Sequence, residues 1–121
     1  MTGQAAAAST PRAEAWRWLA QRASAAVLAV CVLVHLGTML YAVRGGLSAA
    51  EILGRTAGSI GWAAFYGLFV VAVAVHAPLG LRTILAEWAG LAGRAVDVLL
   101  VLLALGLAGG GVSAITAVVA R

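Results

Sequence analysis

Three long apolar runs dominate this sequence, over residues 23–43, about 61–85 and 98–120. The first and third contain no formally charged side chain, and the second contains only Arg82, close to its end. A hydrocarbon core about 30 Å thick is crossed by about 20 helical residues. The runs therefore predict an all-α integral membrane protein, a bundle of three antiparallel transmembrane helices.

The composition agrees with a single transmembrane domain over residues 1–121. Hydrophobic residues make up 64% of the chain and charged residues 10%, whereas soluble domains carry about 25% charged residues. All eight basic residues are arginines, and they lie at the ends of the apolar runs instead of forming a stripe. The net charge of +4 is therefore interpreted as contact with the lipid bilayer, and not as a site for nucleic acid.

Residues 1–21 are expected to precede the first span. The part up to about Arg12 is rich in Ala, Ser and Thr, and is interpreted as a mobile leader without the apolar core of a signal peptide. The stretch from about Ala13 to Gln21 carries Trp16 and Trp18 among arginines. This mixture suits the headgroup layer of a membrane.

Two local patterns predict a helix start between the first two spans and a packing contact within the third. Ser48 followed three residues later by Glu51 has the capping-box spacing, so a short helix is expected from Ser48. Gly106 and Gly110 form a small-xxx-small pair in the third run, which favours close packing against another helix.

Arginine counts predict the orientation of the chain. Positive side chains prefer the cytoplasmic side. Five lie before the first span or between the second and third, against three on the opposite side: Arg12, Arg17, Arg22, Arg82 and Arg94 against Arg44, Arg55 and Arg121. The N-terminus is therefore expected inside.

Both histidines of the chain, His35 and His76, fall within spans. An ionisable side chain there is costly and is a functional candidate. It can ligate haem iron, relay protons, line a polar cavity or hydrogen-bond another helix. If Arg22 and Glu87 mark one surface, His35 is about 20 Å and His76 about 16 Å from it. Two imidazoles at one depth favour a shared haem, or one haem each with a ligand from a partner chain.

The surroundings of the histidines fit a flat macrocycle. Gly37 follows His35 by two residues and Gly80 follows His76 by four, so a porphyrin can approach the helix where a side chain is missing. Arg82 lies about a turn and a half beyond His76, within reach of a haem propionate.

The run from His76 to Arg82, followed by Glu87 and Trp88, resembles the second-helix motif of the membrane anchors of succinate dehydrogenase and fumarate reductase. That motif has a haem-ligating His, a Gly four residues later, then an acid and an aromatic. The run Gln21-Arg22-Ala23-Ser24-Ala25 is similar to the family's first-helix entry. The resemblance covers about residues 16–88.

This resemblance implies three antiparallel helices with the N-terminus inside, in the inner (cytoplasmic) membrane. It implies that His76 is an axial ligand of haem b and that Arg22, Ser24, Glu87 and Trp88 border a quinone. The expected partners are a flavoprotein and an iron–sulfur subunit, and a second anchor subunit to help enclose the haem.

Several features leave alternatives open. Glu87 and Trp88 replace the family's usual Asp and Tyr, and His35 is a second candidate iron ligand besides His76. The chain has neither a dinucleotide fingerprint nor a cysteine set for iron–sulfur ligation, so it is expected to be non-catalytic alone. The alternatives are a haem-free quinone anchor and a structural or transport subunit.

Overall fold

The computed structural model describes residues 10–120 and is all-α. Within that range the helices are α1 (Pro11–Arg44), α2 (Ala49–Thr56), α3 (Ile60–Trp88) and α4 (Arg94–Val119), with no strand. The predicted helical fold class is confirmed. Most of the expected leader and Arg121 lie outside the described residues.

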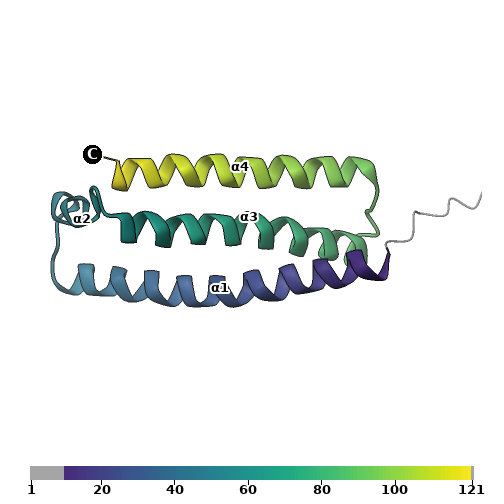
Figure 1. Cartoon of the computed structure of the whole chain (residues 1–121), viewed down its shortest axis with the longest axis horizontal. Helices are drawn as coiled ribbons and strands as arrows, with labels where there is room; N and C mark the ends of the chain where they lie inside the picture. Colours follow the sequence, from purple (N-terminus) through teal and green to yellow (C-terminus); the bar gives the residue numbers. More distant parts are fainter. Residues whose placement is uncertain (1–9, 121) are drawn as a thin grey trace, which may run out of the picture.

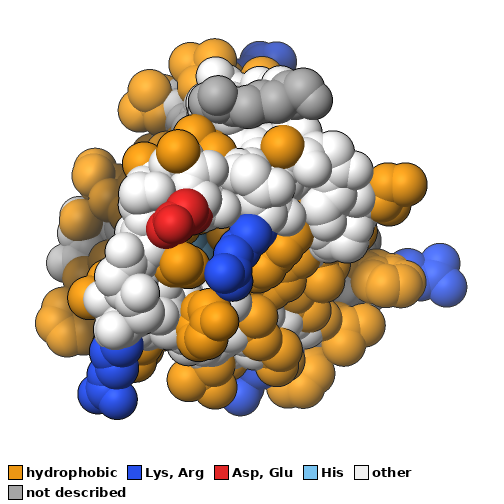
Figure 2. Space-filling model, turned by 90° about the vertical axis from the view of Figure 1, so that its left-hand side faces the viewer, with side chains coloured by type: hydrophobic (Ala, Val, Ile, Leu, Met, Phe, Trp, Pro, Cys, Tyr) orange, Lys and Arg blue, Asp and Glu red, His pale blue; other side chains and the backbone are white. Residues whose placement is uncertain are grey.

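The three long helices are antiparallel neighbours, and α3 lies between α1 and α4 (Figure 1). Each outer helix packs against α3. This arrangement buries very few side chains, and the most enclosed are small ones such as Cys31, 2% exposed, and Ala72, 5% exposed. Viewed from the end that carries α2, hydrophobic side chains surround the molecule (Figure 2). Most of the apolar surface is therefore left for lipid or other chains.

All three long helices have the length and composition to cross a membrane. They contain 34, 29 and 26 residues, which corresponds to about 51, 44 and 39 Å of helix. The predicted spans 23–43 and 61–85 fall inside α1 and α3. The predicted span 98–120 begins four residues after the start of α4 and ends one residue beyond it.

The stretch expected in the headgroup layer and the first span form one continuous helix, α1. The sequence had suggested two separate segments. Thr10 caps α1 by accepting from Ala13 N at 3.2 Å, and Pro11 occupies the first turn, where no backbone N–H is needed. No glycine or further proline interrupts the helix before Gly37. Alanine and arginine, both strong helix formers, fill its first turns.

The predicted capping box at Ser48 is confirmed. Glu51 N donates to Ser48 Oγ at 3.2 Å, and Ser48 N donates to Glu51 Oε2 at 2.8 Å. The C-terminal end of α2 is hydrogen-bonded to the C-terminal end of α4. Thr56 Oγ1 donates to Val118 O at 2.7 Å, and Gly58 N donates to Val119 O at 2.8 Å. These bonds satisfy carbonyls that the last turn of α4 would leave without a partner.

Within this chain the close approach of α4 to another helix occurs at Gly111, and not at Gly106 or Gly110 as the motif suggested. Both of those glycines are exposed, with nothing within 4 Å of an added Cβ. At Gly111 an added Cβ would meet both γ-carbons of Val70 at 2.5 Å. The buried Leu100 and the partly buried residues 104, 107, 111, 115 and 118 set the face of α4 toward α3, and Gly106 and Gly110 lie off that face.

We expect Gly111→Ala to be about 1–3 kcal/mol less stable than Gly110→Ala. Both substitutions gain the same helix propensity, so their difference isolates the collision with the stiff Val70 side chain. Thermal or denaturant unfolding of the purified chain in detergent measures it. Equal stability of the two variants would show that α4 does not approach α3 at Gly111.

Candidate functional site

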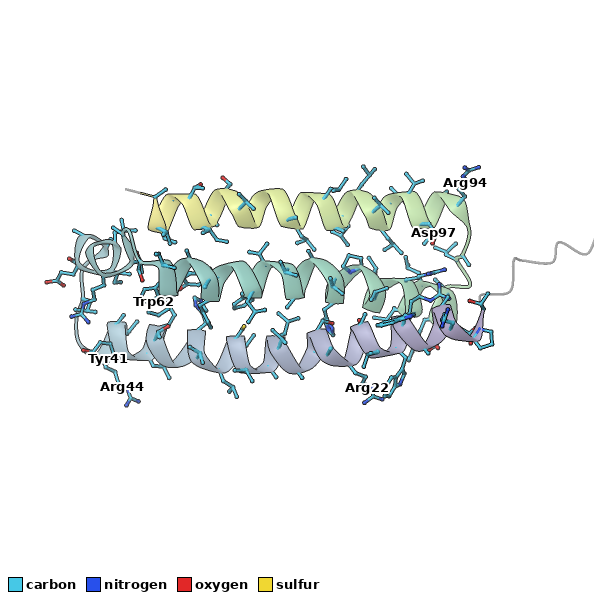
Figure 3. All side chains as sticks on the ribbon, viewed as in Figure 1. Arg22, Tyr41, Arg44, Trp62, Arg94 and Asp97 are labelled. Atoms are coloured by element: carbon cyan, nitrogen blue, oxygen red, sulfur yellow. The ribbon has the colours of Figure 1, made fainter. Side chains whose placement is uncertain are left out.

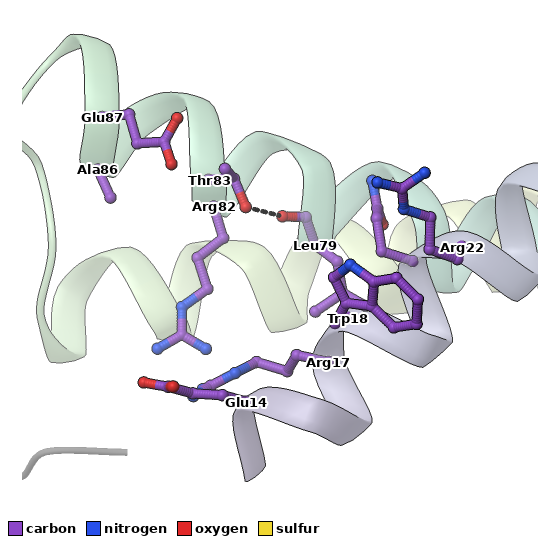
Figure 4. A pocket seen from close by; sticks show the side chains of 10 residues that line it. Glu14, Arg17, Trp18, Arg22, Leu79, Arg82, Thr83, Ala86 and Glu87 are labelled. Atoms are coloured by element: carbon purple, nitrogen blue, oxygen red, sulfur yellow. Dashed lines mark hydrogen bonds between the residues drawn. The ribbon is translucent and has the colours of Figure 1, made fainter. Parts of the chain in front are cut away.

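A groove of about 450 Å³ lies between the first turns of α1 and the last turns of α3 (Figure 4). We call it the α1–α3 groove. Its lining mixes charged, aromatic and amide side chains: Glu14, Arg17, Trp18, Gln21, Arg22, Leu79, Arg82, Thr83, Ala86 and Glu87. It contains three of the site residues expected from the sequence, Arg22, Arg82 and Glu87.

Helical spacing explains why these residues converge. Residues 14, 17, 18 and 21 recur every three or four positions and share one face of α1, as residues 79, 82, 83, 86 and 87 do on α3. Antiparallel packing sets the start of α1 beside the end of α3. Four of the lining residues, all on α1, were not predicted as site residues from the sequence: Glu14, Arg17, Trp18 and Gln21. The same spacing would have found them, had α1 been extended to Pro11.

The groove carries excess positive charge from Arg17, Arg22 and Arg82 over Glu14 and Glu87. The Arg22 guanidinium lies over the Trp18 ring, 5.3 Å from its centroid, which is cation–π geometry. The contact holds an arginine and an indole together at the groove. Both groups can donate hydrogen bonds to a neutral carbonyl or to an anion.

Arg82 also reaches the neighbouring helix. Its Nε lies 3.7 Å from Asp97 Oδ1, and the two side chains are 42% and 53% exposed. At that distance and exposure the ion pair is weak. Arg82 therefore retains N–H groups for another acceptor in the groove.

We expect Asp97→Asn to change the stability of the chain by less than about 1 kcal/mol, because exposed ion pairs contribute little. Unfolding in detergent at low and high salt tests this. A larger loss that persists at high salt would mean that the pair is shielded from solvent.

Ser24 and His76 meet across the interface between α1 and α3. Ser24 is 7% exposed, its Oγ lies 3.4 Å from His76 Nδ1, and Oγ donates to Gln21 O at 3.1 Å. Neither Ser24 nor Trp88 lines the α1–α3 groove. Trp88 ends α3 and is 86% exposed. Of the four residues expected at a quinone, Arg22 and Glu87 share the groove, and Ser24 faces His76.

His35 lies at a different level from His76. Its ring is edge-on to Tyr66 and Phe69, at centroid distances of 6.0 and 6.1 Å, and its Nδ1 is buried without a partner among the described residues. Because Ser24 is opposite His76, His35 is 11 residues further along α1, about 16 Å away along the axis.

The expectation of equal depth for the two histidines is therefore wrong. It assumed that Arg22 and Glu87 mark one surface. The contacts of Ser24 with His76 and of His35 with Tyr66 set the register of the helices, and in that register Glu87 lies opposite Glu14. Arg22 lies opposite Leu79, about 12 Å deeper along α3 than Glu87. One iron cannot bind both histidines of this chain in this arrangement.

The flat face expected beside His76 is partly covered. A Cβ at Gly80 would lie 3.1 Å from Gln21 Nε2, so α1 occupies that side, whereas Gly37 has nothing within 4 Å. No three His, Cys, Asp or Glu side chains gather as a metal site in residues 10–120. An axial haem ligand requires only one imidazole. His76, with Nδ1 turned to Ser24, leaves its Nε2 for that role.

Three apolar helices, an imidazole held between two of them and a cationic groove at one end define a multi-pass membrane protein. The model of the succinate dehydrogenase/fumarate reductase transmembrane subunit family matches residues 3–112. The chain belongs to this family and is a membrane subunit of that kind of complex. No curated protein and no solved structure matches the chain.

Proposed function

We propose that this chain is the haem-b-binding membrane anchor of a succinate:quinone oxidoreductase, and that it passes electrons between an iron–sulfur subunit and membrane quinone. The observation that carries the proposal is the imidazole of His76 held by Ser24 inside a member of this family. Succinate chemistry belongs to the partner flavoprotein, so the chain is one subunit of the enzyme.

His76 is the proposed axial ligand. When bound, haem b accepts and releases one electron at a time. His76 supplies Nε2 because its Nδ1 faces Ser24, and Arg82, about a turn and a half further along α3, retains donors for a propionate. His35 is about 16 Å away along the helix, so it can act only as the ligand of a second haem whose other ligand comes from another chain.

The α1–α3 groove is the proposed quinone site. Arg22 and the Trp18 indole can donate hydrogen bonds to quinone oxygens. Glu87, at the level of Glu14 nearer the end of the groove, is placed to exchange protons with water. The ring of a quinone is shorter than the separation of Arg22 and Glu87, about 12 Å along the axis. The headgroup therefore contacts Arg22, and Glu87 supplies the proton through the groove.

The groove end of the molecule is the proposed inner side. Arg22 and Arg94 lie at that end and Arg44 at the other (Figure 3). Arg17 and Arg82 line the groove itself, so five of the seven described arginines share one end once Arg12 in the first turn of α1 is included. The flavoprotein and iron–sulfur subunits would dock there, on the cytoplasmic side of the inner membrane. A second anchor subunit would cover the apolar faces that the three helices leave exposed.

Purification of the complex through a tag on this chain tests the proposal. The expected result is co-purification of flavin and iron–sulfur subunits, with b haem in the reduced-minus-oxidised spectrum and by pyridine haemochrome. One haem per copy supports His76 with a partner ligand, and two add His35. Partner subunits with quinone reduction but no haem would support the haem-free quinone anchor. Absence of haem, partners and quinone reduction would overturn the proposal.

A further inference from the structure

We propose that Ser24 is a positioning residue for His76. Its hydroxyl holds the imidazole in the tautomer with the proton on Nδ1, which leaves the Nε2 lone pair for iron. This inference rests on the proposed role of His76 as an axial ligand. It gives Ser24 a role at the haem in place of the quinone role that its position in the motif implies.

The hydrogen-bond geometry around Ser24 sets the direction of each bond. A serine hydroxyl has a single hydrogen to donate and two lone pairs to accept. Ser24 Oγ donates to Gln21 O, one turn earlier in α1, at 3.1 Å. Only its lone pairs then face His76 Nδ1 at 3.4 Å. With the hydroxyl hydrogen directed to Gln21 O, the proposed donor of this contact is His76, with its proton on Nδ1.

Burial makes this choice of tautomer effective. Ser24 is 7% exposed and lies in the interface between α1 and α3, so water does not compete for its lone pairs. A ligating histidine commonly donates its other N–H to an oxygen, which fixes the ring and raises its basicity. A more basic Nε2 stabilises the oxidised iron, so the contact lowers the haem potential. The separation of 3.4 Å makes this a weak bond and its effect moderate.

The α1–α3 groove does not account for Ser24. Ser24 is absent from the groove lining, and its only hydrogen is given to the backbone. A quinone oxygen needs a donor, and Ser24 has none left to offer. The positions nearest to it on the same face, Gln21 and Trp18, do line the groove, so α1 serves the quinone with its first turns and His76 with the next.

The tautomer can be measured directly in the full chain. The sequence has two histidines, so labelling with ¹⁵N-histidine in haem-free protein in detergent gives two ring systems, and His35→Asn assigns them. We expect an Nδ1–H ring for His76. Ser24→Ala should shift His76 toward Nε2–H, and Ser24→Thr, whose hydroxyl can also bond the preceding turn, should restore the original signal. An unchanged tautomer in Ser24→Ala would overturn the proposal.

The haem potential is the second readout, in the assembled complex. Ser24→Ala should raise the midpoint potential of the haem at His76, and Ser24→Thr should return it to the original value. Thr38→Ala is the matched control, because Thr38 Oγ1 donates to His35 O at 2.7 Å in the same kind of bond within α1. Equal shifts in Ser24→Ala and Thr38→Ala, or none in either, would overturn the positioning role. A complex without haem would instead refute the proposed function, and the tautomer experiment would still test the Ser24–His76 contact.

Discussion

Replacing His76 with alanine is expected to remove b haem from the complex. Alanine has no lone pair for iron, and no other imidazole of this chain can replace it, because His35 lies about 16 Å away along the helix. His35→Ala is the matched variant. It should leave the His76 haem in place, and it should lower haem content only if the complex contains two haems per copy. Pyridine haemochrome, normalised to copies of this chain, measures both.

The control must separate loss of a ligand from loss of the subunit. His76→Ala removes a partly buried ring from the interface between α1 and α3, and so it can lower stability by about 1–3 kcal/mol. Co-purification of the partner subunits shows whether the variant assembles. If it does, exogenous imidazole should restore part of the haem spectrum. A complex of His76→Ala with full haem content and an unchanged spectrum would rule out His76 as the ligand.

The fold was largely predictable because the bilayer limits what an apolar run can become. A run of about 20 apolar residues has few options other than a spanning helix, and the capping box at Ser48 and Glu51 is satisfied within three residues. Such features depend on neighbours in the chain. They can be read from the sequence alone.

The register between helices was not predictable by the same means. Equal depth for His35 and His76 followed from taking Arg22 as the start of a span. The helix actually begins at Pro11, and the register of α1 against α3 is set by contacts between residues far apart in the chain. The same limit applies to α4, where Gly111 and not the motif glycine Gly110 meets Val70. A motif names small residues, but tertiary packing decides which of them faces a neighbour.

The site was predicted in part for a related reason. Arg22 and Glu87 came from motifs and do line the α1–α3 groove. Trp18, in contrast, was assigned to the headgroup layer as an interfacial anchor. Once α1 is continuous, its first turns face α3, and Trp18 under the Arg22 guanidinium becomes part of the site. Ser24 was linked to the quinone by its place in the first-helix motif that the sequence resembles, whereas its hydroxyl faces α3 and His76.

The second large effect is expected from Arg22→Ala. Loss of a charge-assisted hydrogen bond to a quinone oxygen costs about 1.5–3 kcal/mol, and solvent at this exposed side chain favours the lower figure. We therefore expect kcat/KM for a water-soluble quinone analogue to fall by about tenfold. Succinate oxidation by a dye that accepts electrons from the flavoprotein should not change, because that reaction does not involve the groove.

Arg44→Ala is the control for Arg22→Ala. It removes the same charged group from the same helix, at the end opposite to Arg22 (Figure 3), 22 residues or about 33 Å away. Its quinone kinetics should match those of the unmodified complex. Arg22→Lys adds a second distinction, since it keeps the charge but loses the planar fork that stacks on Trp18. If Arg22→Ala and Arg44→Ala affected quinone reduction equally, the arginines would act through membrane charge, and the quinone would have to bind outside the α1–α3 groove.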